Sequence, residues 1–146
     1  SKYANQYAAA GDKTLIDYLR GGENYRTGNW QGYREDLDVI IDLGKTESIR
    51  TISLGCLQDI KSWIFYPKSV KYYTSIDGSK FDYAGEIITS FSDSTEGSFT
   101  NDYILNLKNK EARFIQIKAE NYGVCPEWHL GAGGVTWIFV DEIKIN

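Results

Sequence analysis

The chain has 146 residues and a net charge of −4 with both signs intermixed, so it is long enough for one domain that buries roughly two-thirds of its surface. This acidic balance argues against nucleic acid and against anionic membrane lipid as the main partner, because both bind a basic field. No apolar run approaches the roughly 18 residues of a membrane-spanning helix. Neither a signal peptide nor an initiator Met is present, so we expect a single domain, residues 1–146, that is a fragment of a longer protein.

The predicted elements begin with a region that has little regular pattern. Asp12 is expected to cap a short helical turn that ends at Gly21-Gly22, and a loop rich in Asn, Gly and aromatic residues follows. From residue 37 onward, alternation of apolar and polar side chains predicts strands, and Asp77-Gly78 predicts a tight hairpin turn. The strand ranges that the pattern defines are 37–43, 49–55, 70–76, 81–88, 103–107, 115–119 and 136–145.

Strands at this spacing with almost no helix predict an all-β fold, which we interpret as an antiparallel sandwich or barrel. If successive strands run antiparallel, alternate connections lie at the same end of the fold. The long connections at one end are then 30–36, 55–67, 89–101 and 120–135, and the short turns at the other are 44–48, 77–80 and 108–111. The long connections carry Trp30, Trp63 and Trp128, so their end is the candidate binding face.

The stretch from Val124 to Gly134 is an irregular loop that carries chemically functional side chains. Its proline and glycines exclude regular structure, yet it contains Glu127, Trp128 and the only histidine of the chain, His129. Loops that carry function sit on rigid scaffolds, and residues 136–145 supply a closing strand. We therefore expect the function at this loop.

Catalytic chemistry finds little support in the residues. A hydrolytic triad needs a histidine beside a serine or cysteine, and His129 stands without a nucleophile elbow. No spacing singles out a pair of glycosidase carboxylates. One histidine cannot make a zinc site without other ligands, and the glycines at 131–134 lack the lysine and helix of a phosphate loop. We expect a non-catalytic domain.

Carbohydrate binding fits the long connections better. A sugar offers apolar C–H faces and many hydroxyls, which are complemented by exposed aromatic side chains beside amides, carboxylates or an imidazole. The candidate aromatic residues are Trp30, Trp63 and Trp128, and the candidate polar neighbours are Gln31, Arg34, Gln58, Asp59, Glu127 and His129. Structural alternatives stay open for several of them: Trp30 as a plug of the core, Trp63 folded over the core, and His129 as a brace of its own loop. Trp137 is assigned to the core.

Two further features leave alternatives open. Asp141 interrupts the apolar parity of the last strand, which suggests a bulge or a buried carboxylate with a partner. The loop 17–29, with Asp17 and Glu142, could wrap a calcium ion, or these carboxylates could simply be solvated. Cys56 and Cys125 could form a disulfide, since the topology puts them at one end, or could be free thiols.

The order of these features resembles the discoidin domain, the type C domain of coagulation factors V and VIII, over nearly the whole chain. The stretches that carry the resemblance are Leu15-Ile16-Asp17, Trp30, Val39-Ile40-Ile41-Asp42-Leu43-Gly44, 49–54, Val70, Ser75-Ile76-Asp77-Gly78, Phe81 and Arg113-Phe114-Ile115-Gln116-Ile117. The close of the chain, Pro126-Glu127-Trp128-His129 followed by 137–143, is similar to the carbohydrate-binding modules appended to bacterial β-hexosaminidases and chitobiases.

The resemblance implies an eight-stranded antiparallel jelly-roll β-sandwich that binds a hexosamine- or galactose-type sugar at its loop tips. It also implies an attached glycoside hydrolase in cis, an extracytoplasmic location (periplasmic, cell-surface or secreted) and a structural calcium ion. Asp17 and Glu142 match the calcium carboxylates of the family and Thr27 lies nearest the hydroxyl ligand, although Asp17-Tyr18 replaces the common Asp-Gly. The alternative function is a protein-interaction or cell-surface adhesion module on the same fold. Lipid binding ranks third because of the acidic charge balance.

Overall fold

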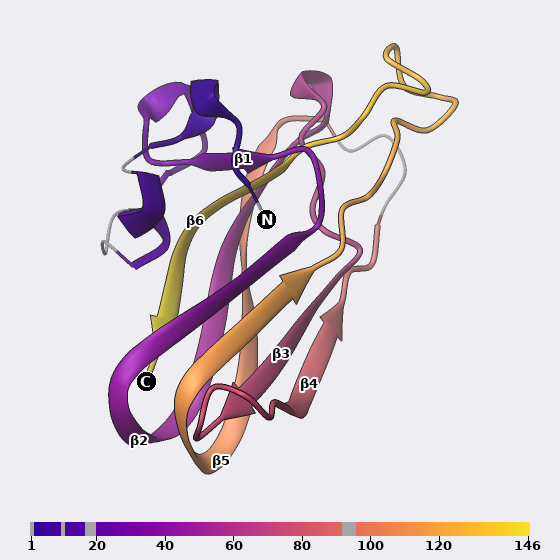
Figure 1. The fold of residues 1–146 in the computed structure, drawn as a ribbon. Helices are drawn as coiled ribbons and strands as arrows, with labels where there is room; N and C mark the ends of the chain where they lie inside the picture. Colours follow the sequence, from indigo (N-terminus) through magenta and orange to yellow (C-terminus); the bar gives the residue numbers. More distant parts are fainter. Residues whose placement is uncertain (1, 10, 17–19, 92–95) are drawn as a thin grey trace.

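Six strands form one antiparallel sheet in the computed structural model, which describes residues 2–9, 11–16, 20–91 and 96–146 (Figure 1). The strands are β1 (Gln31–Tyr33), β2 (Leu37–Asp59), β3 (Ser69–Ser75), β4 (Asp82–Ile88), β5 (Ser98–Ala119) and β6 (Ile138–Ile145), in the sheet order β1-β6-β2-β5-β3-β4. Four short 3₁₀-helices accompany them: η1 (Asn5–Tyr7), η2 (Gly11–Ile16), η3 (Tyr25–Thr27) and η4 (Ile60–Ser62). Among the described residues, no helix has the length and apolar character needed to cross a membrane.

Two long bent strands turn this sheet back on itself. β2 and β5 pair from Leu37 opposite Ala119 to Asp59 opposite Ser98, with register shifts near the bend. Gly44 at φ 84° and Asn109 at φ 52° take the left-handed conformation there, which lets each strand bend while pairing continues on both sides. The bends lie at the lower end of the molecule in Figure 1. Each bent strand therefore contributes one segment to each layer of a sandwich.

The predicted antiparallel all-β sandwich is confirmed, with two refinements. β2 covers the two predicted strands 37–43 and 49–55, and β5 covers 103–107 and 115–119. The short β1 was predicted as loop, yet its three residues are buried and pair with β6. With the halves of β2 and β5 counted separately, the sheet has eight segments.

The core lies between the two layers, where alternate residues of each strand meet. Its fully buried members include Leu37, Ile52, Leu54, Cys56, Val70, Tyr72, Ile115, Ile117, Ile138 and Val140. The Tyr72 hydroxyl donates a hydrogen bond to the carbonyl of Tyr103 over 2.5 Å, so a polar group is satisfied inside this apolar cluster. Burial raises the pKa of Tyr72 above its usual range, which keeps the donor protonated.

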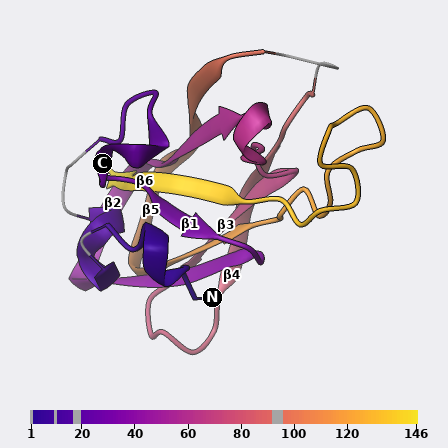
Figure 2. The same ribbon diagram turned by 90° about the horizontal axis from the view of Figure 1, so that it is seen from above.

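The connections divide between two ends as predicted. Figure 1 shows the bends of β2 and β5 and the β3–β4 turn at the lower end, and the β2–β3 and β5–β6 connections at the upper end. Seen from above in Figure 2, the β5–β6 connection and the segment before β1 lie on opposite sides of this end, with η4 between them. The upper end therefore carries two separate groups of chain segments.

A β-bulge marks the middle of the last strand. Leu54 of β2 faces Ile143, but Cys56 faces Val140, so Gly55 alone faces the two residues Asp141 and Glu142. Both carboxylate side chains are buried, with 1% and 2% of their surface exposed. Both alternatives offered for Asp141, a bulge and a buried carboxylate with a partner, are thus present together.

Candidate functional site

A depression of about 400 Å³ opens at the upper end, where η4 meets the connection before β6. We call it the rim depression. The residues that line it are Ile60, Lys61, Trp63, Glu96, Trp128, His129 and Leu130. Two of the three predicted tryptophans thus converge on one concave surface, although they lie 65 positions apart in the sequence.

The rim loop, residues 124–135, is closed by its own backbone hydrogen bonds. Val124 and Val135 form an antiparallel bridge, and the amide of Cys125 donates to the carbonyl of Gly134 over 2.7 Å. Inside this closure the amide of His129 donates to the carbonyl of Pro126 over 3.0 Å. Because these donors and acceptors are satisfied locally, the loop presents its tip in a defined conformation although it has no regular structure.

His129 braces this loop against η4. Its Nδ1 accepts a hydrogen bond from the amide of Gly131 over 2.8 Å, so Nε2 carries the proton and donates to the carbonyl of Ile60 over 2.5 Å. The side chain is only 9% exposed. Both ring nitrogens of His129 are thus engaged within the protein, as the structural alternative describes, and a sugar contact by its ring remains a prediction.

The Trp63 ring packs closely against two glycines of the rim loop. A Cβ atom added to Gly131 would lie 2.5 Å from the Trp63 ring, and one added to Gly134 would lie 2.4 Å from it, so only glycine permits this contact. Trp63 itself takes a left-handed conformation with φ 65°, which is uncommon for a bulky residue and marks local strain. The indole nevertheless remains 37% exposed, so one part supports the loop and another lines the depression.

The tip of the rim loop supplies the most exposed side chains of the site. Trp128 is 47% exposed and its ring centroid lies 6.0 Å from that of His129, at a tilted angle. Leu130 is fully exposed, and Glu127 is exposed beside them. Leu130, Lys61 and Glu96 were not predicted as site residues. Only Leu130 had a signal in the sequence, since it is an apolar residue isolated in a polar, glycine-rich loop.

Two predicted sugar ligands belong instead to the interior. Trp30 is 1% exposed, its Nε1 donates to the carbonyl of Gly22 over 3.0 Å, and a Cβ atom at Gly21 would lie 2.0 Å from its ring. Gln31 is 2% exposed and its amide donates to the carbonyl of Gly11 over 2.9 Å. Neither side chain faces solvent, so we correct both predictions: Trp30 plugs the core and Gln31 fixes the preceding segment.

The remaining predicted ligands lie outside the rim depression. The guanidinium of exposed Arg34 stacks over the ring of half-buried Trp137 at 5.3 Å. Asp59 is half-buried at the end of β2, where its backbone pairs with Ile64. Gln58 is buried and lines a different depression. The structure therefore brings together Trp63, Trp128 and the loop of Glu127, but separates them from the other predicted polar residues.

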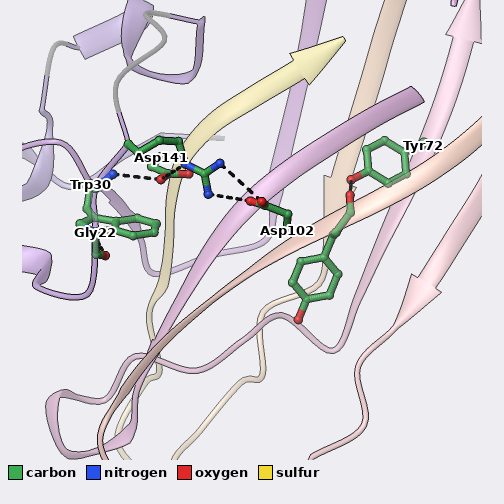
Figure 3. A network of polar contacts seen from close by, with 8 residues as sticks. Gly22, Trp30, Tyr72, Asp102 and Asp141 are labelled. Atoms are coloured by element: carbon green, nitrogen blue, oxygen red, sulfur yellow. Dashed lines mark hydrogen bonds and ion pairs between the residues drawn. The ribbon is translucent and has the colours of Figure 1, made fainter. Parts of the chain in front are cut away.

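The bulge carboxylate Asp141 anchors the segment before β1 (Figure 3). It accepts hydrogen bonds from Arg20 Nε over 2.8 Å and from the amide of Gly21 over 3.0 Å. Arg20 also contacts Asp102 over 2.6 Å. Burial lowers the pKa of Arg20, but the hydrogen bonds to Asp102 and Asp141 more than offset this and leave the pKa raised. A Cβ atom at Gly55 would lie 2.0 Å from Asp141 Oδ1, so the glycine makes room for the ion pair.

The predicted calcium ligands can be placed only in part. Asp17 lies outside the described residues. Thr27 belongs to η3. Glu142 is buried at the bulge, and its carboxylate is a type of ligand that calcium binds. The described residues contain no group of three or more His, Cys, Asp or Glu side chains that could hold a metal ion. The calcium site remains a prediction that rests on Glu142.

The two cysteines are free and buried, and no disulfide joins them. Cys56 belongs to the main core, while Cys125 packs with Ile60 and Phe65 under the rim loop. Burial raises the pKa of both thiols, most strongly that of Cys56. Of the two alternatives that the sequence left open, the structure has the free thiols.

No protein-family model and no curated protein matches this sequence. Solved structures do share its fold. A pectin-binding carbohydrate-binding module is 17% identical and matches over 100% of this chain and 86% of its own, with a TM-score of 0.61. CBM32-1 from a family 31 glycoside hydrolase of Clostridium perfringens is 15% identical over 99% of this chain and 89% of its own, with a TM-score of 0.59. The C-terminal domain of a chitobiase from Bacteroides fragilis is 20% identical over 97% of this chain and 86% of its own, with a TM-score of 0.51.

At these identities the likeness concerns the fold. The resemblance to discoidin-type carbohydrate-binding modules, including those of chitobiases, is confirmed at that level. The chain has the jelly-roll β-sandwich of these modules.

Proposed function

We propose that this domain is a non-catalytic carbohydrate-binding module that holds an attached glycoside hydrolase near its glycan. The observation that carries the proposal is the convergence of Trp63 and Trp128 on one open depression. Trp128 leaves 47% of its surface exposed, so an indole face is accessible to the C–H face of a sugar ring. The fold shared with carbohydrate-binding modules supports the same function.

The edge of the rim depression supplies the polar part of such a site. Lys61 and Glu96 line it, and Glu127 is exposed beside Trp128, so charged donors and acceptors flank the indoles. A hexosamine- or galactose-type sugar offers hydroxyl and amide groups to such partners. Because the surface is shallow, we expect dissociation constants of roughly micromolar to millimolar.

A non-catalytic role agrees with the state of His129. Its two ring nitrogens are engaged by Gly131 and Ile60, so the imidazole is not free to act as a general base. Catalysis would then fall to a separate domain in cis, as in the glycoside hydrolases that carry related folds. Because such glycans lie outside the cytoplasm, the proposal also places the protein in the periplasm, at the cell surface or in the medium.

The second candidate is a protein-interaction or adhesion module. It is favoured by Leu130, which is fully exposed at the loop tip next to Trp128. An apolar tip of this kind can insert into a pocket of a protein partner. This function would use the same surface without any dependence on sugar.

A glycan array followed by calorimetry tests the proposal. The wild type is expected to bind a hexosamine- or galactose-type glycan, and Trp128→Ala to weaken that binding about tenfold, which corresponds to about 1.4 kcal/mol. Tyr83→Ala is the matched control, because Tyr83 is an aromatic residue of β4 with 59% of its surface exposed. Wild-type protein that binds no sugar at millimolar concentration would reject the glycan function and leave the adhesion module as the better reading.

A further inference from the structure

A second depression, of about 360 Å³, lies at the same end of the sheet, where β2 ends and β5 begins. We call it the Gln58 depression. Its lining includes Gln58, Tyr66, Phe91, Phe99 and Asn101. Gln58 and Phe99 face each other across the β2–β5 ladder, and Asn101 faces Cys56. Since side chains alternate along a strand, Gln58, Phe99 and Asn101 extend from the same face of the sheet.

The buried amide at this depression lacks a partner. Gln58 is 7% exposed, and its Oε1 accepts no hydrogen bond from any described residue. Buried polar atoms in folded proteins are almost always paired, so an unpaired acceptor beside an open depression favours any donor that enters it. A hydroxyl or amide group of a ligand would supply that donor.

Aromatic and hydroxyl-bearing side chains surround this amide. Phe91 is 39% and Phe99 44% exposed, so two phenyl rings offer apolar surface at the opening. Asn101, Thr100 and Ser90 add amide and hydroxyl groups. Tyr66 contributes a hydroxyl that stays protonated, because burial raises its pKa to about 12. Exposed rings beside fixed polar groups are the combination that complements a sugar.

A series of ring contacts joins the two depressions. Phe91 meets Tyr122 with ring centroids 5.1 Å apart, Tyr122 stacks on Phe65 at 4.6 Å, and Phe65 lies 5.9 Å from His129. His129 lines the rim depression. The backbone gives the same result, since Gln58 lines one depression and Ile60, two residues later, lines the other. The two depressions therefore lie close together, on either side of the cluster that contains the buried ring of Phe65.

We propose that the Gln58 depression is a second sugar subsite, so that the domain binds an internal stretch of an oligosaccharide across both depressions and not a single terminal sugar. This inference rests on the proposed function, because it assumes that the rim depression holds a sugar residue. The unpaired Gln58 acceptor and the exposed rings of Phe91 and Phe99 then contact the next residues of the same glycan.

Calorimetry with oligomers of increasing length tests the inference. The probes are β1,4-linked N-acetylglucosamine oligomers of one to six residues and galactose oligomers of the same lengths. For the series that binds, the affinity of the wild type is expected to rise at least about tenfold from monomer to hexamer. Phe99→Ala is expected to remove this gain and to leave the affinity for the monomer within twofold of the wild type. Gln58→Leu should act in the same direction.

The controls distinguish a failure of the second subsite from a failure of the proposed sugar binding. Ile104→Ala is the matched control, because Ile104 is 53% exposed and belongs to the same strand, but its side chain extends from the opposite face to Phe99. It is expected to keep the full gain with length. Monomer binding without any gain, or a gain that survives in Phe99→Ala, overturns the second subsite alone. If neither monomer nor hexamer of either series binds, the proposed function and the inference both fail.

Discussion

Two groups of aromatic residues occupy the upper end of the sandwich, and they are used in opposite ways. In the N-terminal segment, residues 20–33, Trp30 is sealed in the interior and its Nε1 meets the carbonyl of Gly22. In the rim loop, Trp128 leaves nearly half of its surface exposed. The N-terminal segment is tied to the sheet by the buried carboxylate of Asp141, whereas the rim loop is tied by backbone hydrogen bonds and one imidazole. The first region therefore stabilises the fold, whereas the second leaves an aromatic side chain accessible to solvent.

The largest effect is expected from Asp141→Ala. The change leaves Arg20 and the amide of Gly21 without their buried acceptor, and each donor that loses its partner in this way costs about 1–3 kcal/mol. Urea unfolding measures the free energy. Asp102→Ala is the control, since its ion pair with Arg20 is partly exposed and should contribute at most about 1 kcal/mol. Equal losses in the two variants would contradict the structural role of the N-terminal segment.

A bound calcium ion would connect the N-terminal segment to β6 at a second point. If Asp17, Thr27 and Glu142 hold the ion, calcium at about 100 times its dissociation constant should stabilise the fold by about 2.7 kcal/mol. The melting temperature should then rise by several degrees and fall again on addition of a chelator. Glu142→Gln should abolish the response, whereas Glu127→Gln in the rim loop should retain it. A melting temperature that does not depend on calcium would remove the ion from the proposal.

A smaller effect is expected from Gly131→Ala in the rim loop. The new Cβ would lie 2.5 Å from the Trp63 ring, so the indole must move, at a cost of about 1–2 kcal/mol. Sugar affinity should fall with it, because Trp63 lines the rim depression. In the background of Trp63→Ala, the same glycine change should cost almost nothing in thermal unfolding. Additive costs in the double variant would mean that the indole does not press on this glycine.

The smallest effect belongs to the far end of the molecule and serves as a reference for both regions. The hydrogen bonds from Arg113 and from the amide of Gly44 lower the pKa of Asp42 to about 2. A lowered pKa stabilises the fold above the ordinary carboxyl pKa, about 4, and this contribution is lost as the pH falls toward 2. The melting temperatures of the wild type and Asp42→Asn should therefore differ at pH 5 and converge near pH 2. A constant difference over this range would contradict the ion pair.

Strand positions could be predicted because the pleat of a strand appears directly in the sequence. Residues 70–76 and 81–88 alternate, and the strands are Ser69–Ser75 and Asp82–Ile88. The continuity of β2 and β5 could not be predicted, because Gly44 and Asn109 read as turn residues whether or not pairing resumes beyond them. The paired residues of β2 and β5 lie between 39 (Asp59 and Ser98) and 82 (Leu37 and Ala119) positions apart in the sequence, and no local pattern shows them.

The site was predictable only in part, for a similar reason. The loop with Trp128 was located from its composition, and Trp63 from the shared end of the connections. The burial of Trp30 depends on contacts with Leu57, Ile64 and Phe139, which only the folded sheet brings together. Phe91 and Phe99 lie within a predicted loop of Ser, Thr, Asp and Gly. Two isolated phenylalanines in such a polar loop are a sequence signal for exposed aromatic surface.

The sheet order has a consequence for how the chain reaches its native state. β6, the last strand in the sequence, lies between β1 and β2, the first two. During synthesis at the ribosome, a gap in the sheet therefore stays open until β6 has emerged, and the edge of β2 remains without a neighbour on that side. Because most strand pairing, apart from the β3–β4 hairpin, is distant in sequence, folding should be slow, on the order of milliseconds to seconds. An exposed strand edge of this kind is prone to aggregation, and a chaperone that shields it would raise the yield of soluble protein.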